Sequence, residues 1–475
     1  MVEQTVVSRD SPGHPGHPLL LAVVGMAQLL VVVDTTIVNI ALPSARQALG
    51  MSEMAAQWTL TAYTLAFGGL LLLGGRLADR WGRRRALVTG ALGFAFASCL
   101  GGTAGDAAEL IAARAAQGVF AALLAPATLS ILAVTFTEPA ARLRAYSALS
   151  AIAMSGSAVG LLAGGALAQF LDWRWCLLVN LPPAIATAVG ARASLPAMAG
   201  ESRSRLDWTS AAVGGGGIAV LAYALSGATD AGTAPRLGLL AVGLALLTVF
   251  GIRQHVVRNP LLPLSIVADR TRGAACVSIV ATGFGMFGMF LFLTFQLQDV
   301  LHFRPLVTGL AFLPFVVANV VAATWLTRRL LPHVGVRSLL AGGMLVLAVG
   351  LALLTRLAGD TPYWTLIAPA EVVLGVGAGL SVPSAINRAT AGVRPRHSGM
   401  AAAFATTSQQ VGASLGTAAL NAVALSAAGT SAVSGYGVAS GWAAAVVACA
   451  AVIVALLAGR TPRPSEVESR APTQL

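Results

Sequence analysis

The stretch Gly-Arg-Leu-Ala-Asp-Arg-Trp-Gly-Arg-Arg-Arg occupies residues 75–85, between two apolar stretches at 55–74 and 86–104. Each apolar stretch has about the 20 residues that an α-helix needs to cross a bilayer. Five arginines lie in the connection, and arginine is enriched in the cytoplasmic loops of membrane proteins. The segment therefore predicts two membrane-spanning helices that are joined on the cytoplasmic side.

Similar apolar stretches fill most of the remaining chain. We place fourteen spans near 19–41, 55–74, 86–104, 107–127, 145–170, 176–195, 208–229, 236–252, 273–296, 305–326, 338–355, 363–384, 399–425 and 437–459. Apolar residues make up 56% of the chain and charged residues only 10%, with a mean hydropathy of +0.79, far from the composition of a soluble domain. The sequence predicts an all-α polytopic membrane protein. Twelve spans would fit only if 208–252 stayed out of the membrane, which its apolarity opposes.

The basic residues fix an orientation for these spans. All 30 are arginines, and with both termini in the cytoplasm 24 of them lie inside, five outside and one, Arg114, within a span. This is the positive-inside pattern of a multi-pass protein of the plasma membrane. The net charge of +12 is spread over short loops and not gathered on one face, so we expect no nucleic-acid partner.

The chain also matches itself at an offset near 255 residues. Ile111–Pro126 aligns with Ala368–Pro383, so that Arg114 falls on Glu371, and Gly82 falls on Gly335 in the equivalent connection. Parallel six-span halves around a central cavity are a repeat architecture of secondary transporters. We expect a cytoplasmic tail at 1–17, a six-helix bundle at 18–195, two inserted helices at 196–260, a second six-helix bundle at 261–459 and a cytoplasmic tail at 460–475.

Residues 75–85 resemble the signature loop of the major facilitator superfamily, whose fold would comprise the two bundles. Glycines at 75 and 82 would allow a tight reversal, and Asp79 could cap a helix or pair with an arginine across the gap between the halves. The alternative is that the arginines only anchor the loop inside. The resemblance implies a conformational latch that holds the cytoplasmic side shut, formed by Gly75, Asp79, Arg80, Gly82, Arg83 and Arg84.

The first span ends Asp-Thr-Thr-Ile-Val-Asn-Ile-Ala-Leu-Pro, from Asp34 to Pro43. This segment resembles the first-span motif of the fourteen-span drug:proton antiporter family within the same superfamily. An ionisable residue inside a span is costly and indicates function. Asp34 is therefore a candidate site for a proton or a cationic substrate. The alternative is a carboxylate that only hydrogen-bonds a neighbouring helix through Thr35 or Asn39.

Arg114, with Gln117 and Gly118, resembles the superfamily's fourth-span motif, in which an arginine faces the cavity. Arginine does not readily lose its proton, so we expect Arg114 to modulate Asp34 or a substrate. Its repeat partner Glu371 is the other carboxylate well inside a span and a second candidate proton or cation site. For both residues a purely structural role is the alternative.

Residues 156–165 in the fifth span read Gly-Ser-Ala-Val-Gly-Leu-Leu-Ala-Gly-Gly and resemble the antiporter motif of the same family. Its glycines, Gly156, Gly160, Gly164 and Gly165, would allow a close helix contact. The family's proline after the second glycine is replaced here by Leu161, which weakens the antiport inference.

Several polar or aromatic residues within spans could line a substrate cavity, or else serve as contacts between helices. They are Asn39, Trp58, Tyr63, Gln117, Gln296, Asn319, Gln409 and Gln410.

The chain lacks the residue patterns of an enzyme. It has no paired His or carboxylate spacing for a metal and no phosphate-binding Gly-Lys loop, so we expect no metal, no cofactor and no ATP hydrolysis. The resemblance implies a monomeric transporter in the lipid bilayer that exports a drug-like small molecule in exchange for protons. An exporter of one metabolite is the nearest alternative; a membrane-embedded enzyme lacks its catalytic cluster, and a transporter-like sensor lacks its soluble domain.

Overall fold

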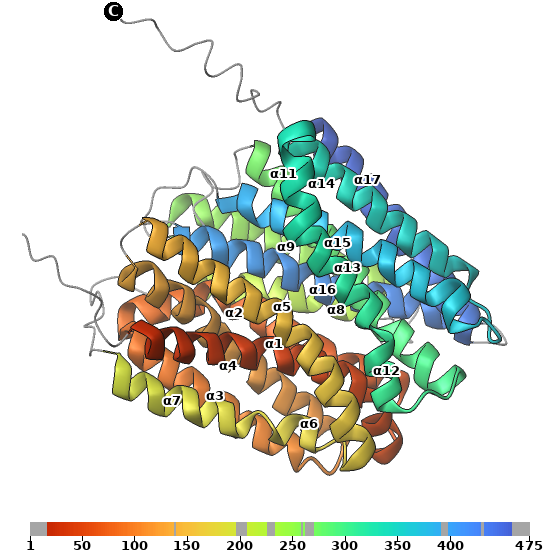
Figure 1. Ribbon diagram of the computed structural model, residues 1–475, viewed down its shortest axis with the longest axis horizontal. Coiled ribbons are helices and arrows are strands. Elements are labelled where there is room, and N and C mark those ends of the chain that lie inside the picture. The colour runs from red at the N-terminus through yellow and green to blue at the C-terminus, as the bar shows by residue number, and fades with distance from the viewer. Residues whose placement is uncertain are drawn as a thin grey trace, which may run out of the picture.

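The computed structural model is a bundle of long helices (Figure 1). It describes residues 17–136, 139–195, 207–225, 233–257, 260–261, 270–390, 398–428 and 432–457. Every regular element within these ranges is helical, which confirms the predicted all-α class. The predicted tails, apart from His17, lie outside the described residues.

The first part of the chain forms α1 (His17–Ala48), α2 (Glu53–Trp81), α3 (Arg83–Gly102), α4 (Ala107–Thr135), α5 (Pro139–Phe170), α6 (Trp175–Leu178) and α7 (Leu181–Ser194). Side chains define where two of these helices begin. Ser52 caps α2 by accepting a hydrogen bond from the Ala55 amide, and Asp106 caps α4 by accepting one from Glu109. Such caps satisfy amides that have no partner within the helix.

The middle of the chain forms α8 (Trp208–Leu225) and α9 (Thr233–Val256), and the last part begins with α11 (Arg270–Phe295), η1 (Gln296–Val300), α12 (Pro305–Ala311), α13 (Leu313–Val321), η2 (Ala322–Leu326) and α14 (Thr327–Leu353). It continues with η3 (Leu354–Arg356), η4 (Tyr363–Ile367), α15 (Ala368–Thr390), α16 (Ser398–Ala427) and α17 (Ala432–Leu457). The segments η1, η2 and η4 are π-helical and η3 is a 3₁₀ turn.

Within the described residues, eleven helical segments are long and apolar enough to cross a membrane. One of them, Pro305–Arg356, contains two predicted spans, and the chain breaks between them at Gly335. The predicted spans at 145–170 and 399–425 lie on α5 and α16, which are not among the eleven. The chain is thus a multi-pass membrane protein, and the count of fourteen spans stays a prediction.

The internal repeat is visible in the backbone. Gly82 and Gly335 both have positive φ, 93° and 74°, a conformation that favours glycine. A Cβ atom added at Gly118 of α4 would clash with the Tyr63 carbonyl of α2 and would lie 3.0 Å from the Phe67 amide. In the second half, a Cβ atom added at Gly375 of α15 would clash with the Phe315 carbonyl of α13 and would lie 3.0 Å from the Asn319 amide. The two copies therefore use glycine at equivalent places to bring helix backbones together.

Helices α8 and α9 lie at the side of the bundle. Helix α8 packs against α2 and α16, and α9 packs against α8. Only 6% of the apolar window of α9 is buried, and large side chains such as Leu237 and Leu244 are exposed on it. This exposure suits a helix that faces lipid on most of its surface.

Candidate functional site

Asp34 of α1 and Arg114 of α4 form an ion pair inside the first group of helices. The Arg114 Nη1 atom lies 2.6 Å from Asp34 Oδ2, and the two side chains are 1% and 0% exposed. Buried charges are tolerated when they are paired and their remaining hydrogen-bonding atoms are satisfied. The structure thus brings together the two residues that the sequence motifs singled out.

Two amide side chains also donate hydrogen bonds to the Asp34 carboxylate. Its Oδ1 atom accepts hydrogen bonds from Asn180 at 2.7 Å and from Gln117 at 3.1 Å. Gln117 also donates to Ser98 Oγ at 2.7 Å and accepts from Arg114 at 2.7 Å. Residues of α1, α3 and α4, with Asn180 just before α7, thus converge on one carboxylate. Ser98 was not foreseen, and the segment Asn180-Leu181-Pro182, although it resembles the fourteen-span family, had no predicted role in the site.

Tyr63 of α2 covers the other side of the arginine. The Arg114 guanidinium carbon lies 4.3 Å from the centre of the Tyr63 ring, a cation–π contact. The close approach of α2 and α4 at Gly118 places Tyr63 there, because a Cβ on Gly118 would fall on the Tyr63 carbonyl. Tyr63, predicted as a cavity residue, is fully buried in this structure.

The glycines of α5 pack mainly on the helix that carries Asp34. A Cβ atom added at Gly160 would clash with the Thr36 hydroxyl. A Cβ atom added at Gly164 would lie 2.9 Å from the Ile37 carbonyl, and one added at Gly156 would lie 3.0 Å from the Leu29 side chain. Gly165 instead approaches Leu306 of α12. The glycine motif therefore holds α5 close to α1, beside Asp34, and also brings α5 to the second half.

Glu371 of α15 is fully buried, but it is not part of the Asp34 cluster. Neither of its carboxylate oxygens has a hydrogen-bond partner among the described residues. The nearby Tyr363 hydroxyl donates to the Ala311 carbonyl at 2.7 Å. A buried carboxyl without a partner is costly in its charged form, which distinguishes Glu371 from Asp34.

The predicted latch differs from its expectation at Gly75. Gly75 does not lie in a turn, because α2 continues to Trp81 and the chain reverses only at Gly82. The N-cap position of α3 is occupied by Gly82, which has no side chain to act as a cap. The Asp79 carboxylate lies 3.8 Å from Arg83 within the same half, and Arg83 donates to Ser130 of α4.

The other latch residues, Arg80 and Arg84, are exposed and half-buried. Next to them, Arg76 donates to the Pro260 carbonyl at 2.7 Å. Helix α2 thus continues through the charged segment 75–81, beyond the apolar span predicted at 55–74.

The other predicted cavity residues make separate contacts. Asn39 donates to the Thr35 carbonyl of its own helix. The centre of the Trp58 ring lies 6.2 Å from that of Tyr223 on α8. Gln296 donates to the Ala358 carbonyl at 3.3 Å. Asn319 and Gln409 are half-buried, and Gln410 lies against Gly68 of α2. None of these contacts joins two of the six residues, and a shared substrate cavity stays a prediction.

The two halves meet most closely at the end of the bundle where α1 ends, which we call the distal end. There Arg46 pairs with Asp299 at 3.1 Å and its guanidinium lies 5.0 Å from the Phe295 ring centre. Gln298 donates to the Ile40 carbonyl at 3.0 Å, and the Leu306 amide donates to Gln169 at 3.2 Å. These contacts close the distal end.

Helices α2 and α16 also join the halves, between the distal end and the middle of the bundle. Asn421 donates to Gln57 at 2.7 Å, and Ser414 donates to Thr64 at 2.8 Å. The Gln57 Nε2 atom is buried and has no partner among the described residues. The sequence analysis did not single out these contacts, because the pairing of α2 with α16 depends on how the halves dock.

Within the described part of the chain, no group of three or more His, Cys, Asp or Glu side chains could hold a metal ion. The Asp34 carboxylate is instead held by Arg114 and by the amide groups of Gln117 and Asn180.

Known proteins resemble the chain over most of its length. It is 45% identical to a puromycin resistance protein of Streptomyces alboniger over 95% of the chain and 94% of the relative. It is 35% identical to a cephamycin export protein of Amycolatopsis lactamdurans over 83% of the chain and 82% of the relative. Its fold matches that of a POT family transporter with a TM-score of 0.72, at 14% identity, over 94% of this chain and 98% of the other. A model of the Major Facilitator Superfamily matches residues 24–417, and the chain therefore belongs to that superfamily.

Proposed function

We propose that this protein exports antibiotics or other hydrophobic or cationic drugs across the plasma membrane, in exchange for protons, by alternating access. The observation that carries the proposal is the buried cluster in which Asp34 meets Arg114, Gln117 and Asn180. A titratable residue buried in a membrane-spanning helix marks a proton or ion pathway. The puromycin resistance and cephamycin export proteins support a substrate of the antibiotic class.

Asp34 is the proposed proton carrier. In this structure its carboxylate is held by one guanidinium and two amide donors. Protonation would remove the charge that Arg114 faces and weaken the hydrogen bonds from Asn180 and Gln117. The arrangement of α1, α4 and α7 would then change with the protonation state, and this couples proton binding to the movement of helices.

Glu371 is the proposed second proton or cation site. It occupies the repeat position of Arg114, and its oxygens have no partner among the described residues. In such an environment, burial of an uncharged carboxyl group costs less free energy than burial of a carboxylate. The two buried carboxyl groups thus differ in their hydrogen-bonding partners in this conformation.

The proposed orientation follows the arginines, with both termini and residues 75–85 in the cytoplasm. The contacts of Arg46 with Asp299 and of Gln298 with Ile40 would then close the extracellular side. The structure would represent a state in which the extracellular path is shut. Residues 75–85 would act as the latch of the opposite state.

The finer architecture is part of the proposal. We infer fourteen spans in two six-helix bundles at 18–195 and 261–459, with the two helices of 196–260 inserted between them, and a monomer that uses no cofactor other than the proton gradient. One proton that moves down 100 mV releases about 2.3 kcal/mol, enough to concentrate a substrate against its gradient. The alternative is a dedicated exporter of one metabolite, such as a self-made antibiotic.

The test is transport in everted vesicles that contain the full chain, in which export appears as uptake of the probes ethidium and puromycin, before and after an uncoupler. We expect efflux that the uncoupler abolishes and that falls at least tenfold in Asp34→Asn and in Glu371→Gln. Asp360→Asn, an exposed distal carboxylate, is the matched control and should transport normally. Efflux that is unaffected by the uncoupler, or that persists in both variants, would refute proton coupling through these residues. Export of puromycin but not ethidium would favour the dedicated exporter.

A further inference from the structure

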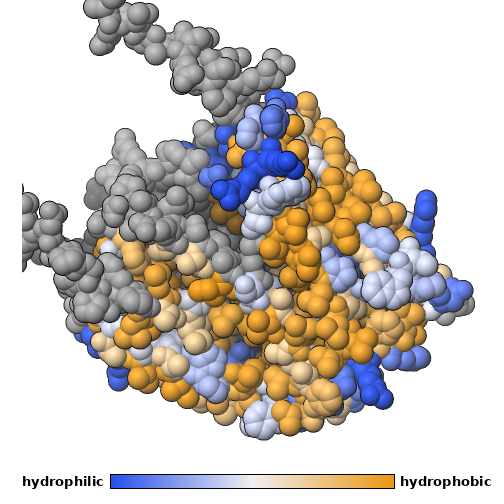
Figure 2. All heavy atoms as spheres, in the orientation of Figure 1, coloured by the Kyte–Doolittle hydropathy of each residue, from blue (hydrophilic) through white to orange (hydrophobic). Residues whose placement is uncertain are grey.

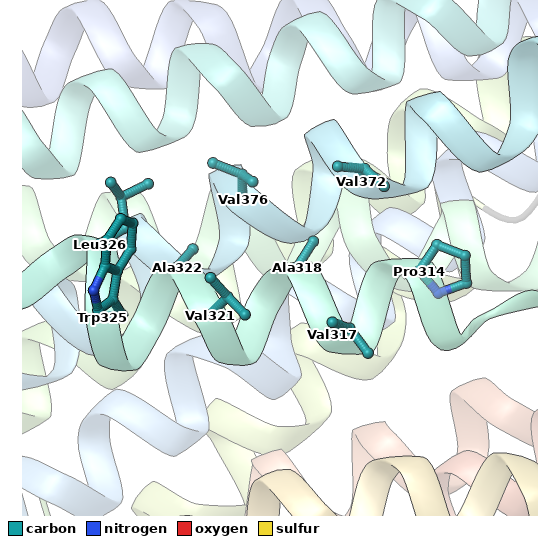
Figure 3. A pocket seen from close by; sticks show the side chains of 9 residues that line it. All are labelled: Pro314, Val317, Ala318, Val321, Ala322, Trp325, Leu326, Val372 and Val376. Atoms are coloured by element: carbon teal, nitrogen blue, oxygen red, sulfur yellow. The ribbon is translucent and has the colours of Figure 1, made fainter.

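An apolar groove lies on the outside of the second half, between α13–η2 and α15 (Figure 3). It has a volume of about 350 Å³, and its lining includes Pro314, Val317, Val321 and Trp325 on one side and Val372 and Val376 on the other. Val317, Val321, Trp325 and Val372 are 43% to 59% exposed. The groove therefore opens toward the surroundings of the protein and not toward the Asp34 cluster.

Charge gathers at one end of this groove. A second hollow is lined by Thr324, Trp325, Arg328 and Arg329, so it shares Trp325 with the first. The Arg329 guanidinium lies 5.0 Å from the Trp325 ring centre. No salt bridge to either arginine occurs within the part of the chain that the structure describes. In Figure 2 the surface along α13 is orange, and blue residues lie at its upper end, where α14 begins.

The dimensions fit a lipid chain. From Pro314 to Leu326 the helical backbone rises about 18 Å at 1.5 Å per residue, close to the ~15 Å of one leaflet, half of a ~30 Å hydrocarbon core. A tryptophan followed by arginines is typical of the membrane–water interface. A phospholipid would thus lie with one acyl chain in the groove and its headgroup beside Arg328 and Arg329.

We propose that this groove is a binding site for an anionic phospholipid of the surrounding bilayer. The two arginines select the headgroup, because guanidinium groups bind phosphate oxygens with paired hydrogen bonds, and a basic pocket between spans attracts anionic lipid. The valines of α13 and α15 hold the acyl chain. The site is separate from the drug–proton pathway, so it does not depend on the proposed function.

The test is native mass spectrometry of the purified full chain, with equal amounts of phosphatidylglycerol and phosphatidylethanolamine. We expect a preference of about 25-fold for the anionic lipid, since each of the two arginines near the surface contributes about a fivefold factor. In Arg328→Gln/Arg329→Gln the preference should fall to about twofold or less. The matched control is Arg85→Gln/Arg192→Gln, which removes two exposed arginines on α3 and α7 and should leave the preference unchanged.

A groove-filling variant tests the acyl-chain half of the site independently. Val321→Trp should reduce retention of both lipids, whereas Val242→Trp, at a 51% exposed position on α9, should not. Equal binding of both lipids by the wild type would overturn the headgroup assignment. A preference that survives the Arg328/Arg329 replacement, or retention that Val321→Trp leaves unchanged, would overturn the site. If the arginine variant does not fold, the Val321→Trp comparison decides.

Discussion

The Arg114 guanidinium lies 2.6 Å from the Asp34 carboxylate, at a point in the bundle where neither side chain is more than 1% exposed. Removal of one member of a buried pair leaves the other charge without a partner, at a cost of about 3–5 kcal/mol. We expect Arg114→Gln to lower the stability of the protein by an amount of this order. The double variant Asp34→Asn/Arg114→Gln should be more stable than the sum of the single effects predicts.

Thermal unfolding of the purified variants in detergent measures this coupling. Arg236→Gln, in a helix end that does not contact the cluster, serves as the control. Additive losses in the double variant would show that the two residues do not interact, contrary to the geometry.

Asn180 donates to Asp34 from the loop before α7, at 2.7 Å. Asn180→Ala should lower efflux several-fold and cost about 1–3 kcal/mol of stability, because a hydrogen bond to a charged group is lost in a buried site. Thr187→Ala on α7 is the matched control, since Thr187 bonds only to its own helix at Pro183 among the contacts described here. Both variants are compared by efflux rate and melting temperature. Normal efflux in Asn180→Ala would remove Asn180 from the site.

Arg46 and Asp299 join the two halves at the distal end, and each side chain is 24% exposed. A partly exposed pair contributes about 1 kcal/mol, so Asp299→Asn should shift the balance away from the closed distal end about fivefold. The Leu306 amide also donates to Gln169 at this end of the bundle. Cysteines introduced at these two positions should then crosslink less efficiently in Asp299→Asn than in the wild type. Arg304→Gln, an exposed distal position, should not change the yield. Unchanged crosslinking in Asp299→Asn would show that the pair does not hold this end.

Asp207 links the beginning of α8 to α9, because Arg253 lies 3.0 Å from its carboxylate and Ser210 donates to it. Burial raises the pKa of Asp207, but the hydrogen bonds from Ser210 and Arg253 outweigh burial and lower the pKa below its ordinary value. A carboxyl whose folded pKa is lowered stabilises the fold above its unfolded pKa of about 3.9 and loses that contribution as the pH falls through the folded value.

The corresponding variant is Asp207→Asn. At neutral pH it should be less stable than the wild type by about 1 kcal/mol, since Arg253 is 35% exposed. The difference should shrink below about pH 4. Melting curves at several pH values give the result, with Asp360→Asn as a control that shows no such trend. A difference that persists at low pH would contradict the ionic role of Asp207.

Glu371 is buried without a hydrogen-bond partner among the described residues. Because no charged contact is lost, Glu371→Gln should keep the melting temperature within a few degrees of the wild type, unlike Arg114→Gln. A large loss of stability would indicate that the carboxyl group is charged and paired in the folded protein. Thermal unfolding of purified Glu371→Gln, Arg114→Gln and wild type in detergent gives the comparison.

The sequence by itself determined the class of fold, because apolar stretches of bilayer length leave only helices as a solution for the backbone. It also identified the family, through the motifs around Asp79 and Asp34, and the repeat, through Gly82 and Gly335, whose positive φ values show why glycine recurs there. Asp34 and Arg114 could be singled out because charged residues within spans are rare.

Only the tertiary structure decided which polar groups meet. Asn180 is 146 residues from Asp34 in sequence, and Arg46 is 253 residues from Asp299, so no local pattern could pair them. Likewise, the end of α2 at Trp81 and the groove beside Trp325 depend on helix packing. Periodicity and composition report how each segment is buried, whereas the contacts between segments depend on how whole helices dock against one another.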